Sequence, residues 1–469
     1  MPARGSRSAP PGIRQIAAAA HDGRGGAALM EENLLIGLAG LAALIAMIAI
    51  RMPIAYSMVT VGAVGIAVLS GPAILLSQLK TLAYGQFSIY DLSVVPMFVL
   101  MGYVATRAGL SRDLFRAANA WLGWMRGGVA MSAIAACAGF GAVCGSSLAT
   151  ASTMGQVALP ELRRYRYAPA LATGTLAAGG VLGILIPPSV VLVIYAIIVE
   201  ANIVTMFIAA FVPGLIAVLF FLATIAIYVR LVPGAGPPGD AVRRQELRDA
   251  SVAVLPVLGI FGLVIGGIYF GFFNPTPAAA VGVFLVTLYG ILRGAVRLAD
   301  LRYALLETAK TSGMIYLILL GAELLKIFMS RGGVPQAAAE MMASSGLPPY
   351  AVLVLLLLAL IVLGCLMDSL SMILLAIPFF WPVIADMDFG MGPEETKVWF
   401  GILALIVVEL GLITPPVGMN VFVINSLARD VPMSVTFRGV LPFFGAELVR
   451  VGLLVAFPAI TLFLPRLLS

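Results

Sequence analysis

Two short stretches with the same pattern, LGILIPPS at residues 182–189 and LGLITPPV at residues 410–417, decide how this chain folds. Each lies in the middle of a long apolar segment that is otherwise typical of a membrane helix. Proline has no backbone N–H and its ring clashes with the preceding turn, so an adjacent pair should end a helix. The sequence therefore predicts one broken helix within residues 168–199 and another within 397–427.

The composition points to a membrane. Hydrophobic residues make up 61% of the 469 residues and charged residues 11%, which is more apolar surface than one soluble core could bury. We therefore expect an all-α, multi-pass membrane protein. The net charge is +6, but most basic residues lie between apolar runs, where they orient the chain in the bilayer. This distribution favours the lipid bilayer as a partner and argues against nucleic acid.

The chain lacks the residue patterns of an enzyme. Cys137, Cys144 and Cys365 lie in apolar surroundings without metal-ligand spacing, which favours small buried side chains. The single histidine, His21, lies in the polar N-terminal stretch, so histidine catalysis inside the membrane is excluded. No G-x-x-x-x-G-K-[ST] phosphate loop occurs. We expect a protein that is not an enzyme and uses no organic cofactor.

The N-terminal stretch differs from the rest. Residues 1–29 are rich in Ala, Gly, Pro and Arg and contain no apolar core long enough for a secretory signal. We expect a disordered leader there. Met30 directly precedes an acidic cap and the first apolar run, so translation starting at Met30 is the alternative to a start at Met1.

Ten apolar segments could cross a hydrocarbon core of about 30 Å, which takes about 17–25 helical residues. Their ranges are 34–50, 54–70, 91–108, 168–199, 203–229, 252–270, 278–292, 311–329, 397–427 and 437–462. The short loops that carry arginine are expected to be cytoplasmic: Arg51, the cluster Arg107, Arg112, Arg116 and Arg126, residues 163–166 and 243–248, and Arg429 with Arg438. Acidic or neutral loops, such as those at Glu200 and 386–395, alternate with them and are expected to lie outside. This alternation predicts both termini outside, and residues 111–124 are amphipathic enough to lie along the cytoplasmic surface.

Two further apolar stretches do not fit the alternation. Residues 127–160 must enter from the cytoplasmic side and return to it, with a turn near 145–150, and residues 350–384 must do the same from outside, with a turn near 367–371. Both are predicted to be re-entrant hairpins. Non-helical backbone at membrane depth is tolerated only where protein or a wet cavity satisfies it.

The chain also contains an internal duplication. Ser146 lies as far before Pro160 as Asp368 lies before Pro382, and each hairpin is followed by a segment with a Pro-Pro pair. Upstream, VPMFVLMGYVATRAGLS (95–111) resembles MIYLILLGAELLKIFMS (314–330). Five spans and one hairpin per copy make the second copy inverted relative to the first. Two inverted repeats with broken helices are typical of secondary transporters.

A broken helix exposes carbonyl oxygens at mid-depth, and hydroxyl groups lie close to both breaks in the sequence. Such oxygens suit an alkali cation, while helix N-termini favour an anionic substrate group. We predict two transported Na⁺ ions, one per repeat. The first site would use Gly145, Ser146, Ser147, Gly183 and Pro187, the second Asp368, Ser369, Gly411, Thr414 and Gly418, and the substrate region Thr150, Pro188, Ser189, Pro415 and Pro416. The competing interpretation is that the small residues only allow close helix packing.

Other ionisable and aromatic residues inside the spans have structural interpretations. Glu323 with Lys326, and Glu447 with Arg450, are three apart on one helix face and should neutralise each other. Glu409 could brace the second break or carry a proton, and bracing is favoured. The tryptophans near segment ends are expected to be interfacial anchors. They are Trp121, Trp124, Trp381 and Trp399.

The order of motifs carries a family resemblance. The segments VPMFVLMG, GAVCGSSLATA, GGVLGILIPPS, MDSLSMILLAIPFFWPV and ELGLITPPVGMNVF, from about Met30 to the C-terminus, resemble the large membrane subunit (DctM type) of tripartite ATP-independent periplasmic (TRAP) transporters. The family's ion-site motifs fall on Gly145, Ser146, Ser147, Pro187, Pro188, Asp368, Thr414, Pro415, Pro416 and Gly418.

The resemblance implies a sodium-driven elevator importer in the bacterial inner membrane. Its partners would be a separate small four-helix membrane subunit, because no extra helices precede residue 34, and a periplasmic substrate-binding protein that delivers a small carboxylate. Scaffold helices would occupy 30–90 and, with a cytoplasmic loop, 230–310. Transport regions would occupy 91–229 and 311–469.

Two other classes remain open at this point. One is a stand-alone sodium- or proton-coupled organic anion carrier of related inverted-repeat fold, which would need neither the small subunit nor the binding protein. The other is a channel or an assembly subunit without a transport cycle. The sequence argues against a channel, because it contains no repeated motif of charged residues or backbone carbonyls that could form the selectivity filter of a symmetric pore.

Overall fold

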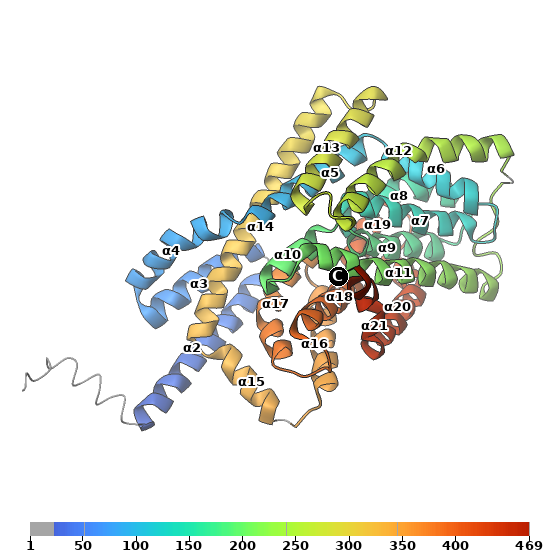
Figure 1. Cartoon of the computed structure of the whole chain (residues 1–469). Helices are drawn as coiled ribbons and strands as arrows, with labels where there is room; N and C mark the ends of the chain where they lie inside the picture. Colours follow the sequence, from blue (N-terminus) through green and yellow to red (C-terminus); the bar gives the residue numbers. More distant parts are fainter. Residues whose placement is uncertain (1–22, 51, 241, 345, 469) are drawn as a thin grey trace, which may run out of the picture. The chain divides into compact units, whose positions relative to one another are not determined.

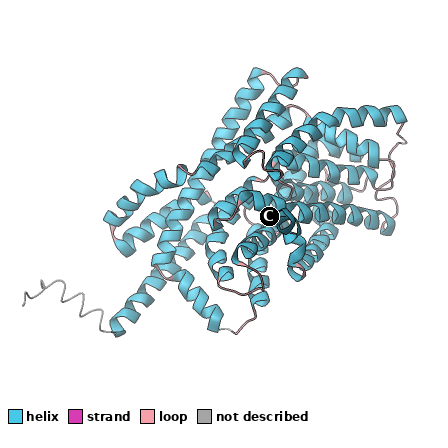
Figure 2. Cartoon of the chain, in the orientation of Figure 1, coloured by secondary structure: helices cyan, strands magenta, loops and turns pink. Residues whose placement is uncertain are grey.

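The computed structural model describes residues 23–468 except 51, 241 and 345. The described residues form helices and turns and contain no strand, as Figure 2 shows. The first long helix, α2 (Gly23–Ala49), begins inside the stretch for which the composition predicts disorder, so residues 23–29 are helical. Residues 1–22 of that leader lie outside the described residues.

The chain divides into two compact units, and α14 (Leu298–Arg331) contributes to both. The first unit holds residues up to 86 and residues 317–347. Its other helices are α2, α3 (Ile54–Ser70), α4 (Pro72–Phe87) and α15 (Val334–Ser344) (Figure 1). Phe328 of α14 fills the space beside Gly40 and Gly65, where an added Cβ would lie 2.3 Å from its ring. Small residues thus let α2 and α3 pack against an aromatic ring.

The second unit holds residues 87–316 and 348–469. It contains the Pro-Pro motifs and both predicted hairpins. Its helices, besides the first part of α14, are α5 (Val94–Arg107), α6 (Leu110–Leu122), α7 (Gly128–Cys144), α8 (Ser147–Arg164), α9 (Pro169–Leu185), α10 (Val190–Val199), α11 (Ile203–Leu231), α12 (Arg244–Tyr269), α13 (Pro275–Leu292), α16 (Pro349–Gly364), α17 (Ser369–Ala385), α18 (Pro393–Gly411), α19 (Met419–Leu427), α20 (Met433–Ala456) and α21 (Pro458–Leu468).

Both proline pairs lie at helix breaks. α9 ends at Leu185 and α10 begins at Val190, with a bend of 46° between the two helices. α18 ends at Gly411 and α19 begins at Met419. The Pro187–Pro188 and Pro415–Pro416 peptide bonds are both cis. The helices end there because neither proline of a pair can donate the hydrogen bond that would continue the turn.

The two predicted hairpin stretches each form two helices joined by a short break, α7 with α8 and α16 with α17. Each second helix begins with a side-chain cap. The Ser146 hydroxyl accepts a hydrogen bond from the Ala149 amide at 3.4 Å, and the Asp368 carboxylate accepts one from the Ser371 amide at 3.1 Å. Such caps satisfy amides that have no partner within the helix. Whether the hairpins are re-entrant stays a prediction.

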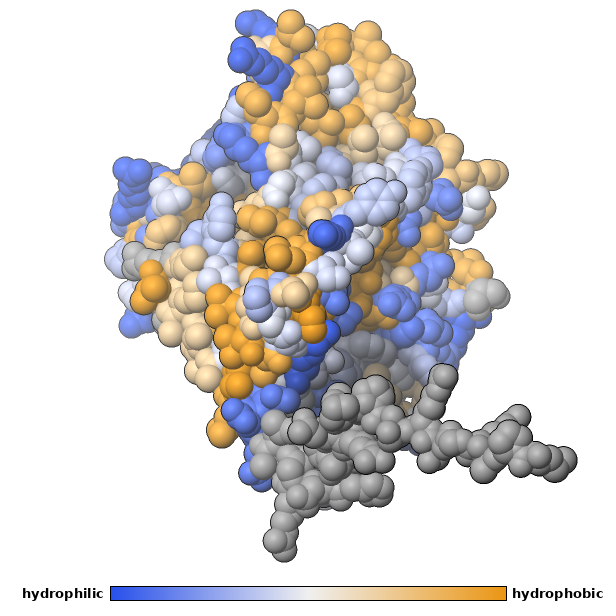
Figure 3. All heavy atoms as spheres, turned by 90° about the vertical axis from the view of Figure 1, so that its left-hand side faces the viewer, coloured by the Kyte–Doolittle hydropathy of each residue, from blue (hydrophilic) through white to orange (hydrophobic). Residues whose placement is uncertain are grey.

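Six described helices are long and apolar enough to cross a membrane, or up to eight if the bent helix pairs within 72–107 and 169–199 each count as one span, compared with ten predicted spans. α3, with 17 residues, falls just short of that length. The predicted span 437–462 is two helices, because Pro458 starts a new helix after α20 ends at Ala456. Exposed apolar side chains are numerous, among them Leu35, Tyr84 and Leu292. On the face in Figure 3, hydrophobic residues form broad patches between hydrophilic groups.

Loops predicted to be cytoplasmic contact one another. Arg163 forms an ion pair with Asp430. The Tyr165 hydroxyl donates to the Asp240 carboxylate at 2.7 Å, and this bond, with burial, raises the pKa of Tyr165. The Gly127 amide donates to the carbonyl of Gly236 at 2.9 Å. These contacts join the loops after α8, α11 and α19.

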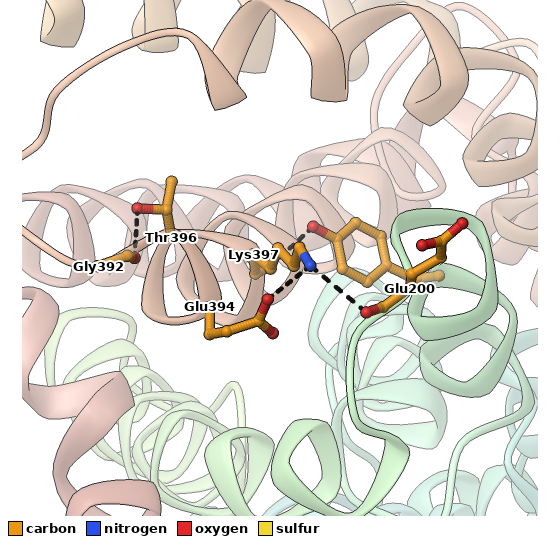
Figure 4. Close-up of polar contacts among 6 residues, drawn as sticks. Glu200, Gly392, Glu394, Thr396 and Lys397 are labelled. Carbon is orange, nitrogen blue, oxygen red and sulfur yellow. Dashed lines mark hydrogen bonds and ion pairs between the residues drawn. The ribbon is translucent and has the colours of Figure 1, made fainter.

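Loops predicted to lie outside form a separate group. In Figure 4 the Lys397 ammonium at the start of α18 reaches the Glu394 carboxylate at 2.7 Å and the Glu200 carbonyl, at the end of α10, at 3.4 Å. Arg466, near the C-terminus, donates to both carboxylate oxygens of Glu395 at 2.7 and 2.9 Å, and this pairing lowers the pKa of Glu395. Loops predicted to be cytoplasmic thus contact one another, and loops predicted to lie outside contact one another.

One buried ion pair lies in α20. The Glu447 carboxylate and the Arg450 guanidinium are both fully buried, and the Nε–Oε2 distance is 3.0 Å. A second guanidinium nitrogen donates to the Pro213 carbonyl of α11 at 2.9 Å. The predicted mutual neutralisation of this pair is confirmed. The other predicted pair, Glu323 with Lys326, is also present, at 3.7 Å and partly exposed.

The prediction for Trp399 is wrong. Its side chain is fully buried rather than at an interface, and the indole Nε1 donates to the Leu454 carbonyl at 2.9 Å. It packs edge-to-face against Phe389. Position near a helix end suggested an anchor, but α20 and the loop before α18 cover this side chain. Trp121 and Trp124 are more than half exposed.

Candidate functional site

One cavity of the second unit lies where the two hairpins meet. It has a volume of about 930 Å³ and is lined by α5, α6, α8 and α14 together with both hairpin breaks. Five of the predicted site residues line it. They are Gly145, Ser146 and Ser147 from the first hairpin, and Asp368 and Ser369 from the second. The fold thus brings residues 145–147 and residues 368–369, which are far apart in the sequence, to one cavity.

A carboxylate connects the two hairpins. Glu409 of α18 is fully buried, and its two oxygens accept hydrogen bonds from the Ser147 hydroxyl and the Ser369 hydroxyl. Both serines are the first residues of their helices, α8 and α17. No described cation forms an ion pair with Glu409. A single side chain therefore ties together the starting points of the two helices that follow the hairpin breaks.

Sequence reasoning found Glu409 but not its partners. The favoured interpretation was bracing, and the hydrogen bonds support a bracing role. What it braces, however, is the pair of hairpins rather than the unwound segment beside Thr414. The Thr414 hydroxyl, in the break after α18, donates instead to the Leu410 carbonyl in the last turn of α18 at 2.6 Å. The pattern around residue 409 contains no local signal for these serines, because both are distant in sequence.

Asp368 has a cap role as well as a place at the cavity. Its Oδ1 accepts from the Ser371 hydroxyl at 2.6 Å, and its Oδ2 accepts from the Ser371 amide. These bonds hold the carboxylate at the N-terminus of α17, where the helix dipole stabilises a negative charge. The carboxylate has further lone pairs, so a cation in the cavity could still bind it.

The predicted glycines of the two breaks serve close packing. An added Cβ on Gly183 would lie 2.5 Å from the Thr150 hydroxyl and 2.8 Å from the Ser146 carbonyl. On Gly411 it would lie 2.6 Å from the backbone of Gly364. Each broken helix thus touches its hairpin through a glycine. Such contacts agree with the interpretation that the small residues allow close helix packing. Neither Gly183 nor Gly411 lines the cavity.

The remaining predicted residues also lie away from the cavity lining. Ser189 caps α10 by accepting from the Leu192 amide at 3.3 Å. Gly418, at the start of α19, has a φ of +58°, which favours glycine. Thr150 is buried, with a hydroxyl that has no hydrogen-bond partner among the described residues. The others in this group are Pro187, Pro188, Thr414, Pro415 and Pro416.

Two arginines that line the cavity, Arg107 and Arg112, are predicted from the sequence only to lie in loops. Arg107, at the end of α5, and Arg112, at the start of α6, line the cavity and are exposed. Arg107 lies 3.6 Å from the Asp300 carboxylate and 4.4 Å from the centre of the Tyr303 ring. The cavity therefore has hairpin oxygens and basic groups in one lining. Charge counting along loops could not show that these arginines face a cavity.

The three cysteines are buried and free, as their apolar surroundings predict. Cys144 lines the cavity beside Gly145. The described residues contain no cluster of three or more His, Cys, Asp or Glu side chains that could hold a metal ion. The oxygen atoms at the cavity are hydroxyls, carbonyls and one carboxylate, which are hard ligands.

Comparisons with known proteins were made for the whole sequence. The sequence model described as "Tripartite ATP-independent periplasmic transporter, DctM component" matches residues 41–460. The C4-dicarboxylate TRAP transporter large permease protein DctM of Pseudomonas aeruginosa is 35% identical over 81% of this chain and 87% of its own length. The sialic acid TRAP transporter large permease protein SiaM of Vibrio cholerae is 31% identical over 89% of this chain and 95% of its own.

A solved structure has a similar fold. The YdaH transporter of Alcanivorax borkumensis superposes with a TM-score of 0.58 at 17% sequence identity, covering 82% of this chain and 89% of the transporter. At this identity the likeness concerns the helical fold.

Proposed function

The chain belongs to the DctM-component family of tripartite ATP-independent periplasmic transporters, and from this membership we propose that it imports a carboxylate-bearing solute by sodium-coupled secondary transport. Members of this family are inner-membrane permeases rather than enzymes, and this chain is accordingly a multi-pass inner-membrane protein without enzymatic activity. Sodium coupling and the identity of the solute are the proposed part.

The observation that carries the proposal is the cavity between the hairpins. Ser146, Ser147, Asp368 and Ser369 bring hydroxyl, carbonyl and carboxylate oxygens from both halves of the chain to one lining. Hard oxygens of this kind suit an alkali cation. Each inward sodium charge gains about 2.3 kcal/mol per 100 mV of membrane potential, so two sodium ions can drive the uptake of a monoanion.

The solute class comes from the relatives. The two relatives named above transport C4-dicarboxylates and sialic acid according to their names, and both kinds of solute carry a carboxylate. The proposal extends this class to the present chain. Helix N-termini at α8 and α17 would favour the anionic group, because backbone amides there point towards the cavity end of each helix.

The proposed partners are a small four-helix membrane subunit and a periplasmic substrate-binding protein. Both would be separate chains, as in the tripartite systems after which the family is named. The stand-alone anion carrier is the alternative. It would transport without a binding protein, and the experiment below separates the two.

The proposed mechanism is an elevator with two inverted repeats. Matched features support the repeats: two hairpins whose second helix has a side-chain cap, and two helix breaks that each contain a Pro-Pro pair. In this mechanism the two sodium sites, the first around Ser146 and the second around Asp368, would move together, because Glu409 links the hairpins. Scaffold and transport regions would be those expected from the sequence.

We expect Asp368→Asn to raise the sodium concentration needed for half-maximal uptake about tenfold, because it removes one ligand charge. Asparagine is a good helix N-cap, so α17 should stay intact. The measurement is uptake of succinate by proteoliposomes that hold this chain, its small partner and purified binding protein, over a range of inward sodium gradients.

Asp386→Asn is the matched control, since Asp386 is exposed at the other end of α17 and does not line the cavity. Uptake by the wild type that continues without sodium would sink the sodium mechanism. Uptake that continues without the binding protein would favour the stand-alone carrier. An unchanged sodium requirement in Asp368→Asn would remove Asp368 from the ion site.

A further inference from the structure

The lining of the cavity between the hairpins includes basic residues that the proposed sodium sites do not use. Arg107 and Arg112 line it, together with neutral polar side chains such as Thr106, Ser152 and Gln156. Asp368 is the one acidic residue among the described residues of the lining, and its two oxygens already accept hydrogen bonds from Ser371. Positive charge therefore exceeds negative charge around this space.

The two arginines differ in how far their charges are compensated. The Arg107 guanidinium lies 3.6 Å from the Asp300 carboxylate and over the Tyr303 ring. The Arg112 side chain is exposed and forms neither an ion pair nor a hydrogen bond with any described residue. An uncompensated guanidinium at the mouth of a cavity with low-dielectric walls concentrates anions there.

The local fold keeps Arg112 in this position. Gly109 turns the chain with a φ of +81°, and α6 begins directly after it. Leu110, Ser111 and Asp113 are buried on the inner face of α6, and Asp113 accepts a hydrogen bond from the Tyr289 hydroxyl at 3.0 Å. Arg112 is thus the residue of this first turn that points away from the packed face. The backbone of Arg112 is therefore held in place, while its guanidinium is available to bind an anion.

We propose that Arg112 is the anchor of an anion-binding vestibule, a second site for a carboxylate between the hairpin tips and the side of the membrane on which the arginine loops lie. A guanidinium binds a carboxylate through two parallel hydrogen bonds. The hydroxyl of the neighbouring Ser111, which also lines the cavity, can donate to the same group. The identity of the cargo rests on the proposed function, whereas binding at Arg112 requires no sodium.

The test uses a cysteine reporter at the exposed cavity residue Gln156. Gln156→Cys is introduced into the full chain with the three native cysteines replaced by alanine, in nanodiscs of neutral phosphatidylcholine and without sodium. The rate of alkylation by N-ethylmaleimide is measured as succinate is added, with choline chloride keeping the ionic strength constant. We expect succinate to slow alkylation, and Arg112→Gln to raise the succinate concentration for half-protection about tenfold.

Arg116→Gln is the matched control. Arg116 lies one turn further along α6 and is also exposed, but it does not line the cavity. Arg116→Gln should therefore leave the protection by succinate against alkylation unchanged. Arg112→Lys, which keeps the charge but not the paired hydrogen bonds, should protect to an intermediate degree.

Three outcomes would overturn the proposal: protection that survives in Arg112→Gln, an equal loss in Arg112→Gln and Arg116→Gln, or protection by inorganic phosphate as strong as that by succinate. The neutral lipid excludes an anionic headgroup as the protecting group. Because the assay contains no sodium and measures no transport, its failure leaves the sodium-coupled function untouched. Conversely, the loss of sodium coupling would leave this result unchanged.

Discussion

Replacing Glu447 by alanine should destabilise the protein by about 3–5 kcal/mol, because it leaves the Arg450 guanidinium buried without a counter-charge. Both side chains are fully buried, and Arg450 also holds the Pro213 carbonyl of α11. The charge cannot reach water without pulling α20 away from α11. The measurement is thermal or denaturant unfolding of the purified chain in detergent, followed by tryptophan fluorescence.

Two further variants test the explanation. Glu447→Leu combined with Arg450→Met removes both charges at once and should recover most of the lost stability, because an apolar pair of similar size avoids the desolvation cost. Glu323→Ala breaks the pair with Lys326, which has the same spacing but is partly exposed, and should cost at most about 1 kcal/mol. Equal losses from Glu447→Ala and Glu323→Ala would contradict the burial argument.

Replacing Glu409 by alanine should destabilise the protein by about 2–6 kcal/mol and abolish transport. Two buried serine hydroxyls lose their acceptor, and each such group costs about 1–3 kcal/mol. The hairpin tips that line the cavity would then no longer be tied to α18. Unfolding in detergent and uptake in proteoliposomes, measured on the same preparation, report the two effects.

Glu409→Gln is the milder control. Its amide oxygen can accept from one serine and its amide nitrogen can donate to the other, so most of the stability should remain. A double-mutant cycle with Ser147→Ala and Ser369→Ala measures the coupling directly. If the losses of unfolding free energy in Glu409→Ala and in the serine variants simply add, the hydrogen bonds of Glu409 to the two serines contribute nothing to stability.

The features that could be predicted from the sequence depend on local chemistry. The helix breaks lie at the two Pro-Pro pairs because a missing N–H acts within one turn. The Glu447–Arg450 pair was predictable because both residues lie three apart on one helix. In each case the partner is near in sequence, and the type of residue alone decides the outcome.

The features that could not be predicted depend on packing between distant segments. The serine partners of Glu409 are 262 and 40 positions away. Trp399 is buried by α20. Arg112 lines a cavity that α5, α6, α8 and α14 form together with both hairpin breaks. α4 was missed because its sequence mixes polar with apolar residues over 16 positions, which weakens any span signal. Hydropathy and spacing carry no information about such contacts.

The bridge at Glu409 makes the two halves of the chain unequal. When LGILIPPS is aligned with LGLITPPV, Glu409 of the second half stands opposite Val181 of the first, and Val181 is buried. One carboxylate thus serves a serine from each half. If the halves arose as copies, the second has specialised and the first now depends on it. A chain assembled from two first halves would contain both hairpins but no acceptor for their hydroxyls, whereas one assembled from two second halves would bury two carboxylates.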